Sequence, residues 1–479
     1  MEALKNLNPV IKQLLWLPFA ILGGLVVYKA GLVGAVGLIM IIVMFFLLRH
    51  LYLVPKNGVF IALLISFFVN GITRYIVDSP LGLSIDFILV LTLIIAVFSP
   101  VKGNLKNLNS GVFWFSMVWF AFTVAELFNP EARSKEAWFY AVRAVSLYQI
   151  FVVVVALLYI NSFRDLKYFV HINLGIIALS VLWAAKQMYI GLDAGETTWL
   201  AEGAYRTHIL RGVLRTFSFF SDAGQFGATA AYAGLVGFIL ALGPFKPSAR
   251  IFYLIVGILG FWGMLMSGTR GALFVPASGV FAYLIATRNI RIFIIGLIVV
   301  VGAYSFLKYT TILNENNQVR RLRSALDPND PSLQVRLENQ RKFKVYLATR
   351  PIGGGIGTSG TWGIRFTPGT FLAMTANDSW YVKIWAETGI IGLYLHIGMI
   401  LFFVFYGYYV IFKINDPPLK SYIMAIHAGF FGIACAAYGN PILGQFPLSI
   451  MLYTTWAFFV IAPGLDSKIK IASNELRIT

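Results

Sequence analysis

Long apolar stretches follow one another along nearly the whole chain and are separated by short polar connections. A hydrocarbon layer about 30 Å thick needs roughly 20 apolar residues per helical crossing, which is the length of these stretches. We therefore predict an all-α integral membrane protein with about fourteen transmembrane helices. The helices are expected near residues 13–28, 31–48, 58–74, 82–99, 110–127, 140–160, 168–190, 223–243, 251–267, 271–287, 290–307, 380–412, 421–438 and 443–463.

Basic residues mark every second connection between the expected helices, as at Arg49, Lys102 and Lys413. Positive charge favours the cytoplasmic side of a membrane, so this alternation predicts that both termini are cytoplasmic. The opposite side then receives two long connections, residues 191–222 and 308–379. Connections of this length usually carry function.

The large connection over residues 308–379 divides the chain into three expected parts. We expect a helical bundle over residues 1–307, a large extracytoplasmic catalytic loop over residues 308–379, and three helices with a short cytoplasmic tail over residues 380–479. The large loop has an excess of basic residues, which indicates an anionic ligand. A solvated surface facing lipid headgroups is the alternative, because long loops cross the membrane regardless of charge.

Composition supports the membrane location and limits the function. Of the 479 residues, 58% are hydrophobic and 12% are charged, so a water-soluble fold would expose large apolar faces. The formal charge of +18 has no soluble basic domain to carry it, which excludes nucleic acid as a partner. The lone cysteine, Cys435, excludes an intrachain disulfide. No His, Cys, Asp or Glu spacing indicates a metal, and no cofactor is expected.

Arginines are the first candidates for binding chemistry outside the cytoplasm, because a guanidinium donates two hydrogen bonds to a phosphate and keeps its proton. Arg270 stands in the motif SGTRGAL between two apolar stretches. Arg336 and Arg341 lie on an expected helix of the large loop, and Arg211 and Arg215 precede the eighth expected helix.

Each main arginine also has a purely structural interpretation. Arg270 would be a snorkelling interfacial side chain or a topology anchor. Arg336 would form an i, i+4 pair with Gln340 or lie on a solvated helix face. The motif PIGGGIG, with Gly353, Gly355 and Gly357, would be either a phosphate cradle or a plain loop.

Asp378 stands just before the apolar stretch that begins WYVKIW, and two roles fit this position. By position it is a helix N-cap. Facing outward beside several arginines, it also suits a carboxylate that accepts a proton from a sugar hydroxyl. His208 is the only histidine in an external connection, so the histidines offer no better base.

The sequence SGTRGAL, the loop arginine at position 336, RPIGGGIG and NDSWYVKIWAETGIIG together resemble the signature of the O-antigen ligase and polymerase superfamily, over roughly residues 262–395. The resemblance implies a GT-C-like glycosyltransferase of the bacterial inner membrane. Such an enzyme takes a glycan from an undecaprenyl diphosphate carrier at the periplasmic face, without metal or nucleotide sugar. The acceptor would be a glycan, a lipid or a protein.

Carried over by position, Arg270 and Arg336 match the two arginines expected to grip the diphosphate. Asp378 stands where the ligases have His, and Ser379 where they have Asn. This departure, together with the number of expected helices, favours a polysaccharide polymerase or a ligase with another acceptor. We expect Asp378 to act with both arginines in catalysis. The expected substrate-binding residues are Arg211, Arg215, Arg341, Gly353, Gly355, Gly357, Asn377 and Ser379.

Two other functions are compatible with a chain of this kind. A non-catalytic transporter or flippase of lipid-linked glycans would show charged residues along its helices from one face to the other, whereas the middle of most stretches is nearly free of charge. A structural membrane subunit would leave the convergence of external motifs without a role.

Overall fold

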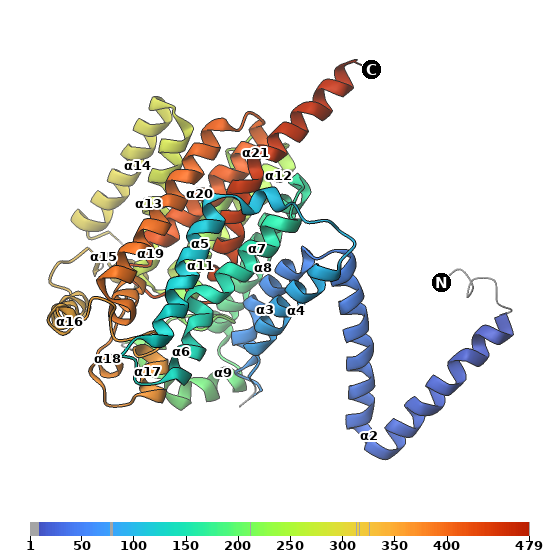
Figure 1. Ribbon diagram of the computed structural model, residues 1–479. Helices are drawn as coiled ribbons and strands as arrows, with labels where there is room; N and C mark the ends of the chain where they lie inside the picture. Colours follow the sequence, from blue (N-terminus) through green and yellow to red (C-terminus); the bar gives the residue numbers. More distant parts are fainter. Residues whose placement is uncertain are drawn as a thin grey trace.

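The computed structural model describes residues 9–76, 80–210, 212–312, 314–315, 317–324 and 326–478. This described part is an all-helical bundle apart from one short hairpin (Figure 1). The apolar stretches form α2 (Pro9–Leu53), α3 (Asn57–Ile72), α4 (Leu83–Phe98), α5 (Gly111–Ala125), α6 (Lys135–Val142), α7 (Tyr148–Tyr159), α8 (Phe163–Ala185), α11 (Ala223–Ala241), α12 (Pro247–Ser267), α13 (Phe274–Thr287), α14 (Ile290–Tyr309), α19 (Trp380–Lys413), α20 (Pro417–Ala436) and α21 (Leu448–Ile478).

Shorter elements lie in the connections. They are α9 (Ala194–Trp199), α10 (Tyr205–His208), α15 (Asn317–Ser324), α16 (Pro331–Leu347), α17 (Gly360–Phe366), α18 (Phe371–Met374), the antiparallel strands β1 (Ile209–Leu210) and β2 (Val213–Leu214), the 3-10 turns η1 (Leu105–Leu108), η2 (Glu126–Phe128) and η6 (Arg270–Leu273), and the π-helical turns η3 (Arg143–Leu147), η4 (Lys186–Ile190) and η5 (Leu200–Ala204).

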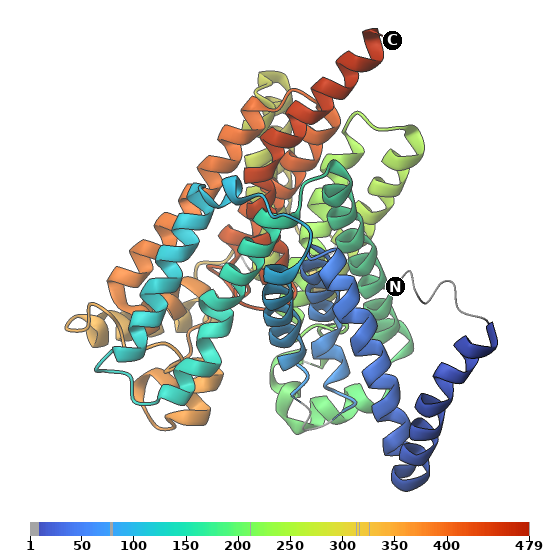
Figure 2. The same ribbon diagram turned by 45° about the vertical axis from the view of Figure 1, so that its right-hand side comes forward.

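Among the described residues, ten helices are long and apolar enough to cross a membrane, so the chain is a multi-pass membrane protein. The expected number of about fourteen is higher. The first two expected helices are the two arms of α2, which meet at Gly31, where φ of 56° and ψ of −137° are not helical, so the pair counts as one candidate crossing. The two arms make a V in which the first arm stands away from the bundle (Figures 1 and 2). In addition, α3 and α4 are apolar but shorter than a full crossing.

Small residues bring the central helices close together. In the span formed by α11, 94% of the residues are buried, and α12 packs directly on it. A Cβ added at Gly260 of α12 would lie 2.4 Å from the backbone nitrogen of Gly234 in α11. Larger side chains there would push the two backbones apart, so these glycines set the helix spacing at the centre of the bundle.

The two long connections meet at one end of the bundle. Helices α9, α16, α17 and α18 all lie at the end opposite to the C-terminus in both views (Figures 1 and 2). The turn between α12 and α13 and the start of α19 contribute to a cavity beside α16. The segments singled out in the sequence therefore converge in space.

Candidate active site

A cavity of about 210 Å³ lies where four segments meet. These segments are the α12–α13 turn, the region from α15 through α16, the residues that lead into and begin α19, and the residues just after α20. Its charged and polar lining includes Arg270, Ser324, Asp327, Asp330, Arg336, Asp378 and Tyr438. Arg270, Arg336 and Asp378, which come from three separate motifs, are thus brought together.

Arg270 is presented by a sharp helix end. Helix α12 stops at Gly268, whose φ of 56° is a left-handed conformation that favours glycine. The backbone N–H of Thr269 donates to Ser267 Oγ at 3.1 Å, which fixes the turn. The guanidinium of Arg270 then reaches the cavity, where Nη1 pairs with Asp330 Oδ2 at 2.5 Å. The side chain is therefore held by a carboxylate in the cavity, unlike a snorkelling arginine.

Arg336 lies on α16, and its ion pair is formed with Asp378 rather than with Gln340. Arg336 Nε lies 3.7 Å from Asp378 Oδ2. Within the described part of the chain, this Nε is buried without a hydrogen-bond partner. The distance to Asp378 is longer than a hydrogen bond, so the two side chains form an ion pair without a hydrogen bond at Nε.

Asp378 is not the N-cap of α19. The cap is Ser379, whose Oγ accepts a hydrogen bond from Val382 N at 3.5 Å. The N-cap interpretation of Asp378 is therefore wrong by one residue, since a cap is decided by backbone geometry that the sequence DS leaves open. The Asp378 side chain is 49% exposed and lines the cavity, whereas Ser379 is buried.

Asn377 lies outside the cavity lining and belongs to a buried chain of polar side chains that the sequence did not predict. Its Nδ2 donates to Ser359 Oγ at 2.8 Å, and Ser359 Oγ donates to Glu387 Oε1 at 2.6 Å. Glu387 is fully buried in α19. An acidic residue within a long apolar stretch was the available signal, because a buried carboxylate needs donors.

The glycine-rich turn lies outside the cavity lining and packs against α19. Gly353, Gly355 and Gly357 have φ values of 76°, 94° and 85°. The N–H groups of Gly354 and Gly355 donate to the carbonyls of Ala386 and Glu387 at 3.0 and 2.8 Å. These donors are occupied by the helix backbone, so the turn locks the large connection onto α19.

The remaining arginines that were expected to bind substrate lie outside the cavity lining or outside the described residues. Arg341 is 78% exposed and pairs with Glu338 at 3.7 Å. Arg211 lies outside the described residues. Arg215 is half-buried against the turn that carries Arg270. Its Nη2 donates to Thr269 Oγ1 at 2.9 Å.

The pKa and the hydrogen bonds of Arg215 also indicate that this residue supports the turn that carries Arg270. Burial lowers its pKa, an effect that Asp222 opposes and the nearby charge of Arg270 reinforces. Its Nη1 also donates to the carbonyl of Thr207 at 2.8 Å. Arg215 therefore connects the 191–222 segment to the turn that carries Arg270.

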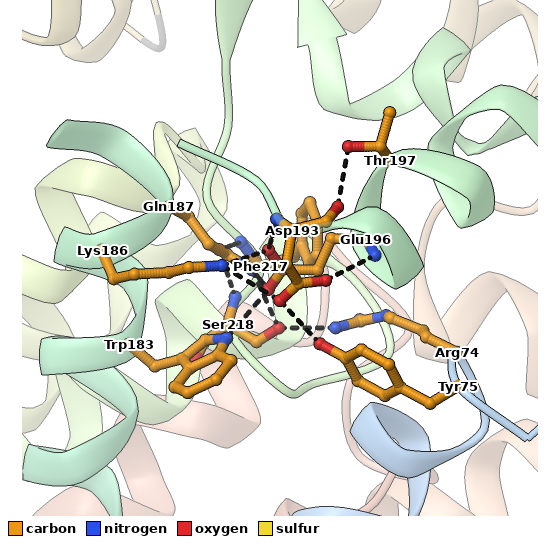
Figure 3. Close-up of polar contacts among 10 residues, drawn as sticks. All are labelled: Arg74, Tyr75, Trp183, Lys186, Gln187, Asp193, Glu196, Thr197, Phe217 and Ser218. Atoms are coloured by element: carbon orange, nitrogen blue, oxygen red, sulfur yellow. Dashed lines mark hydrogen bonds and ion pairs between the residues drawn. The ribbon is translucent and has the colours of Figure 1, made fainter. Parts of the chain in front are cut away.

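A second polar network holds other residues of the 191–222 segment (Figure 3). Lys186 Nζ pairs with Asp193 at 3.0 Å and with Glu196, which is almost fully buried, at 2.9 Å. Arg74 lies over the rings of Trp199 and Phe217 at 4.3 and 4.4 Å. Burial lowers the pKa of Arg74 to about 10, so it stays charged at neutral pH.

Asp193 accepts several hydrogen bonds in the same network. Burial alone would raise its pKa, but hydrogen bonds from the Glu196 backbone, Lys186 and Tyr75 together hold the pKa below its usual value. Tyr75 Oη donates to Asp193 Oδ2 at 2.9 Å. The ionised carboxylate ties the start of the 191–222 segment to the chain after α3.

Fold and site together define a multi-pass α-helical membrane protein with a polar cavity, lined by arginine and aspartate, at one end of its bundle. No known family profile matches the chain. The chain is 30% identical over 197 residues to the O-antigen polymerase of Salmonella muenchen, a match that covers 39% of this chain and 45% of that protein. The match confirms the predicted resemblance to the O-antigen ligase and polymerase superfamily, while the chain spans less than half of that relative's length.

Proposed function

We propose that this protein is a membrane glycosyltransferase that moves a glycan from an undecaprenyl diphosphate carrier to an acceptor hydroxyl. The observation that carries the proposal is the meeting of Arg270, Arg336 and Asp378 in one cavity. The similarity to an O-antigen polymerase supports the same class of reaction.

The two arginines suit the leaving group. As the acceptor oxygen bonds to the anomeric carbon, the bond from that carbon to the diphosphate oxygen breaks and the electron pair stays on the diphosphate. Guanidinium groups fixed beside this oxygen stabilise the charge as it develops. Arg270 and Arg336 supply fixed donors from two different elements, the α12–α13 turn and α16.

We assign Asp378 to the acceptor hydroxyl. A hydroxyl must lose its proton as it attacks, and a carboxylate within hydrogen-bonding reach takes that proton. Asp378 is half-exposed on the cavity and is not engaged in capping α19. In the proposed step Asp378, which faces Arg336 at 3.7 Å, orients the hydroxyl and accepts its proton.

An apolar groove beside the cavity suits a lipid-linked donor. It has a volume of about 430 Å³ and lies between α19 and α20. Tyr381, Trp385 and Phe431 line it, and it shares Val382 and Tyr438 with the polar cavity. A molecule with a charged head and a hydrocarbon chain would contact both without a break.

The proposed location is the bacterial inner membrane, with the cavity facing the periplasm. The basic connections expected on the cytoplasmic side and the convergence of both long connections at the other end support this orientation. No metal is assigned a role. Within the described residues, no group of three or more His, Cys, Asp or Glu side chains could hold one.

We favour a polysaccharide polymerase or a ligase with an acceptor other than lipid A core, because Asp378 replaces the histidine of the ligases. Deletion of the gene tests this function. Loss of a surface glycan, with build-up of its carrier-linked repeat unit, is expected. Unchanged surface and carrier-linked glycans would contradict it, and loss of carrier-linked glycan from the periplasmic leaflet alone would favour a flippase.

A further inference from the structure

Both arginines of the cavity are already paired with carboxylates of the protein itself. Arg270 Nη1 contacts Asp330 Oδ2 at 2.5 Å and Ser324 Oγ at 3.1 Å. Arg336 faces Asp378 at 3.7 Å. Two carboxylates thus stand beside the guanidinium groups to which the proposed function assigns a diphosphate.

The charges of the cavity lining do not favour an anion in this state. Two arginines, Arg270 and Arg336, stand against three aspartates, Asp327, Asp330 and Asp378. The lining therefore carries one more negative than positive charge. A diphosphate placed beside these carboxylates would be repelled by them, and like charges brought together in a partly desolvated site are costly.

Helix α16 is packed tightly in its C-terminal half and loosely in its N-terminal half, so its N-terminal end can move. Its C-terminal half is anchored, because Phe343 and Leu347 are buried against residues of α18 and α19. In its N-terminal half, Leu333 and Leu337 are only half-buried. Asp330 is also the N-cap of this helix, since its Oδ1 accepts a hydrogen bond from Leu333 N at 3.1 Å. A shift of Asp330 therefore moves the start of α16.

We infer that Asp330 is an internal stand-in for phosphate: it occupies Arg270 in the substrate-free protein, and the carrier diphosphate displaces it. Displacement frees a guanidinium edge for bidentate contact and releases the N-terminal end of α16 from the turn between α12 and α13. Asp330 thereby determines how tightly a diphosphate binds. This inference rests on the proposed function, because it assumes that a diphosphate enters the cavity.

The substitution Asp330→Asn separates the two roles of this residue. Asn caps a helix about as well as Asp, but it carries no charge to compete for Arg270. Asp330→Ser, another good cap, is the second variant should the first fail to fold. Asp327→Asn is the matched control, because Asp327 lines the same cavity and the change removes the same charge. In the described part of the chain, Asp327 Oδ1 accepts a hydrogen bond from Asn329 N at 2.9 Å within a local turn.

The experiment measures binding of farnesyl diphosphate and of inorganic pyrophosphate to the purified full chain in nanodiscs. If Arg270 is free about one tenth of the time, removing its competitor strengthens binding about 10-fold. Asp330→Asn should show this gain and Asp327→Asn a clearly smaller one. In an Arg270→Ala background the gain should vanish. A gain with the prenyl compound alone identifies a lipid carrier as the ligand, and an equal gain with pyrophosphate identifies the diphosphate group.

Weaker binding in Asp330→Asn would show that the carboxylate positions Arg270, and would overturn the inference. A gain no larger than that of Asp327→Asn would overturn it too, because it would reflect net charge alone. If the parental protein binds a probe and Arg270→Ala does not, the proposed function is still supported in either case. If the parental protein binds neither probe, both this inference and the proposed function are contradicted.

Discussion

Asp378 Oδ2 lies 3.7 Å from Arg336 Nε, and both side chains line the cavity that Arg270 also enters. The carboxylate belongs to the segment that leads into α19, and the arginine belongs to α16. This pair sets a carboxylate beside a guanidinium, which is the arrangement on which the proposed transfer from a diphosphate to a hydroxyl relies.

Replacing Arg270 or Arg336 with Ala should abolish glycan transfer while the protein still inserts. Loss of one partly desolvated charged contact costs on the order of 2 to 5 kcal/mol. Lys should rescue poorly, because it lacks the two-pronged contact. The control is Arg341→Ala, which removes an exposed arginine outside the cavity lining and should leave transfer unchanged. Transfer at the parental rate in both cavity variants would remove the proposed site.

Asp378→Asn should lower transfer by about 100-fold or more, because the amide cannot take the proton. The thermal midpoint should stay close to the parental value, since the cap of α19 is Ser379. Ser379→Ala, by contrast, should lower stability by about 1 kcal/mol because the cap is missing. Kinetics and thermal melts of the purified variants check both. Parental rates in Asp378→Asn would assign the base elsewhere.

Ser359→Ala should destabilise the protein by about 1 to 3 kcal/mol, because it leaves the buried carboxylate of Glu387 without its hydroxyl donor. Adding Glu387→Gln should recover part of this loss, since the second change removes the buried carboxyl group that has lost its donor. Chemical denaturation of the single and double variants measures the coupling. Independent, additive losses would show that the Ser359–Glu387 contact contributes no stability.

Acid should weaken the anchoring of the 191–222 segment through His208. Its Nδ1 donates to Ala204 O at 2.9 Å, and its Nε2 accepts from Ala223 N at 3.3 Å, so the folded protein holds the neutral ring. Burial lowers its pKa. Stability from this group is complete above the unfolded pKa of about 6.5 and falls as pH drops towards the lower folded value.

The measurement for His208 is the thermal midpoint between pH 8 and pH 5. The parental protein should lose stability on acidification more steeply than His208→Gln, which has no titrating ring. Equal slopes in the two proteins would contradict the assignment.

Cysteines placed at Gly360 or Gly203 should react with an impermeant thiol reagent in intact spheroplasts, whereas one at Ser248 should not. The reason is the alternation of basic connections, which assigns the first two positions to the periplasmic side. Cys435 is first replaced by Ala. Labelling at Ser248 alone would reverse the orientation.

The hydropathy pattern located the long helices because burial in lipid requires continuous apolar runs. It also separated the two arms of α2, which meet at the non-helical Gly31. The role of the glycines in residues 351–357 could not be decided from the sequence. Close approach to a ligand and close approach to α19 require the same residue type.

Charged residues that line the cavity were predictable where they interrupt an apolar stretch or begin one, as with Arg270 and Asp378. Their partners were not. Asp330 lies 60 residues beyond Arg270 in the chain, and Ser359 lies 28 residues before Glu387. Pairing over such separations is decided by how the helices pack, which local sequence does not encode.

The most direct test of the central claim is transfer by the purified protein in liposomes that contain the lipid-linked glycan and an acceptor glycan. Released polyprenyl diphosphate and new glycosidic bonds are measured together. The proposed transfer releases one carrier diphosphate for each bond formed, and both products should be lost in Arg270→Ala and Asp378→Asn. Movement of intact lipid-linked glycan across the bilayer, without release of diphosphate, would contradict it.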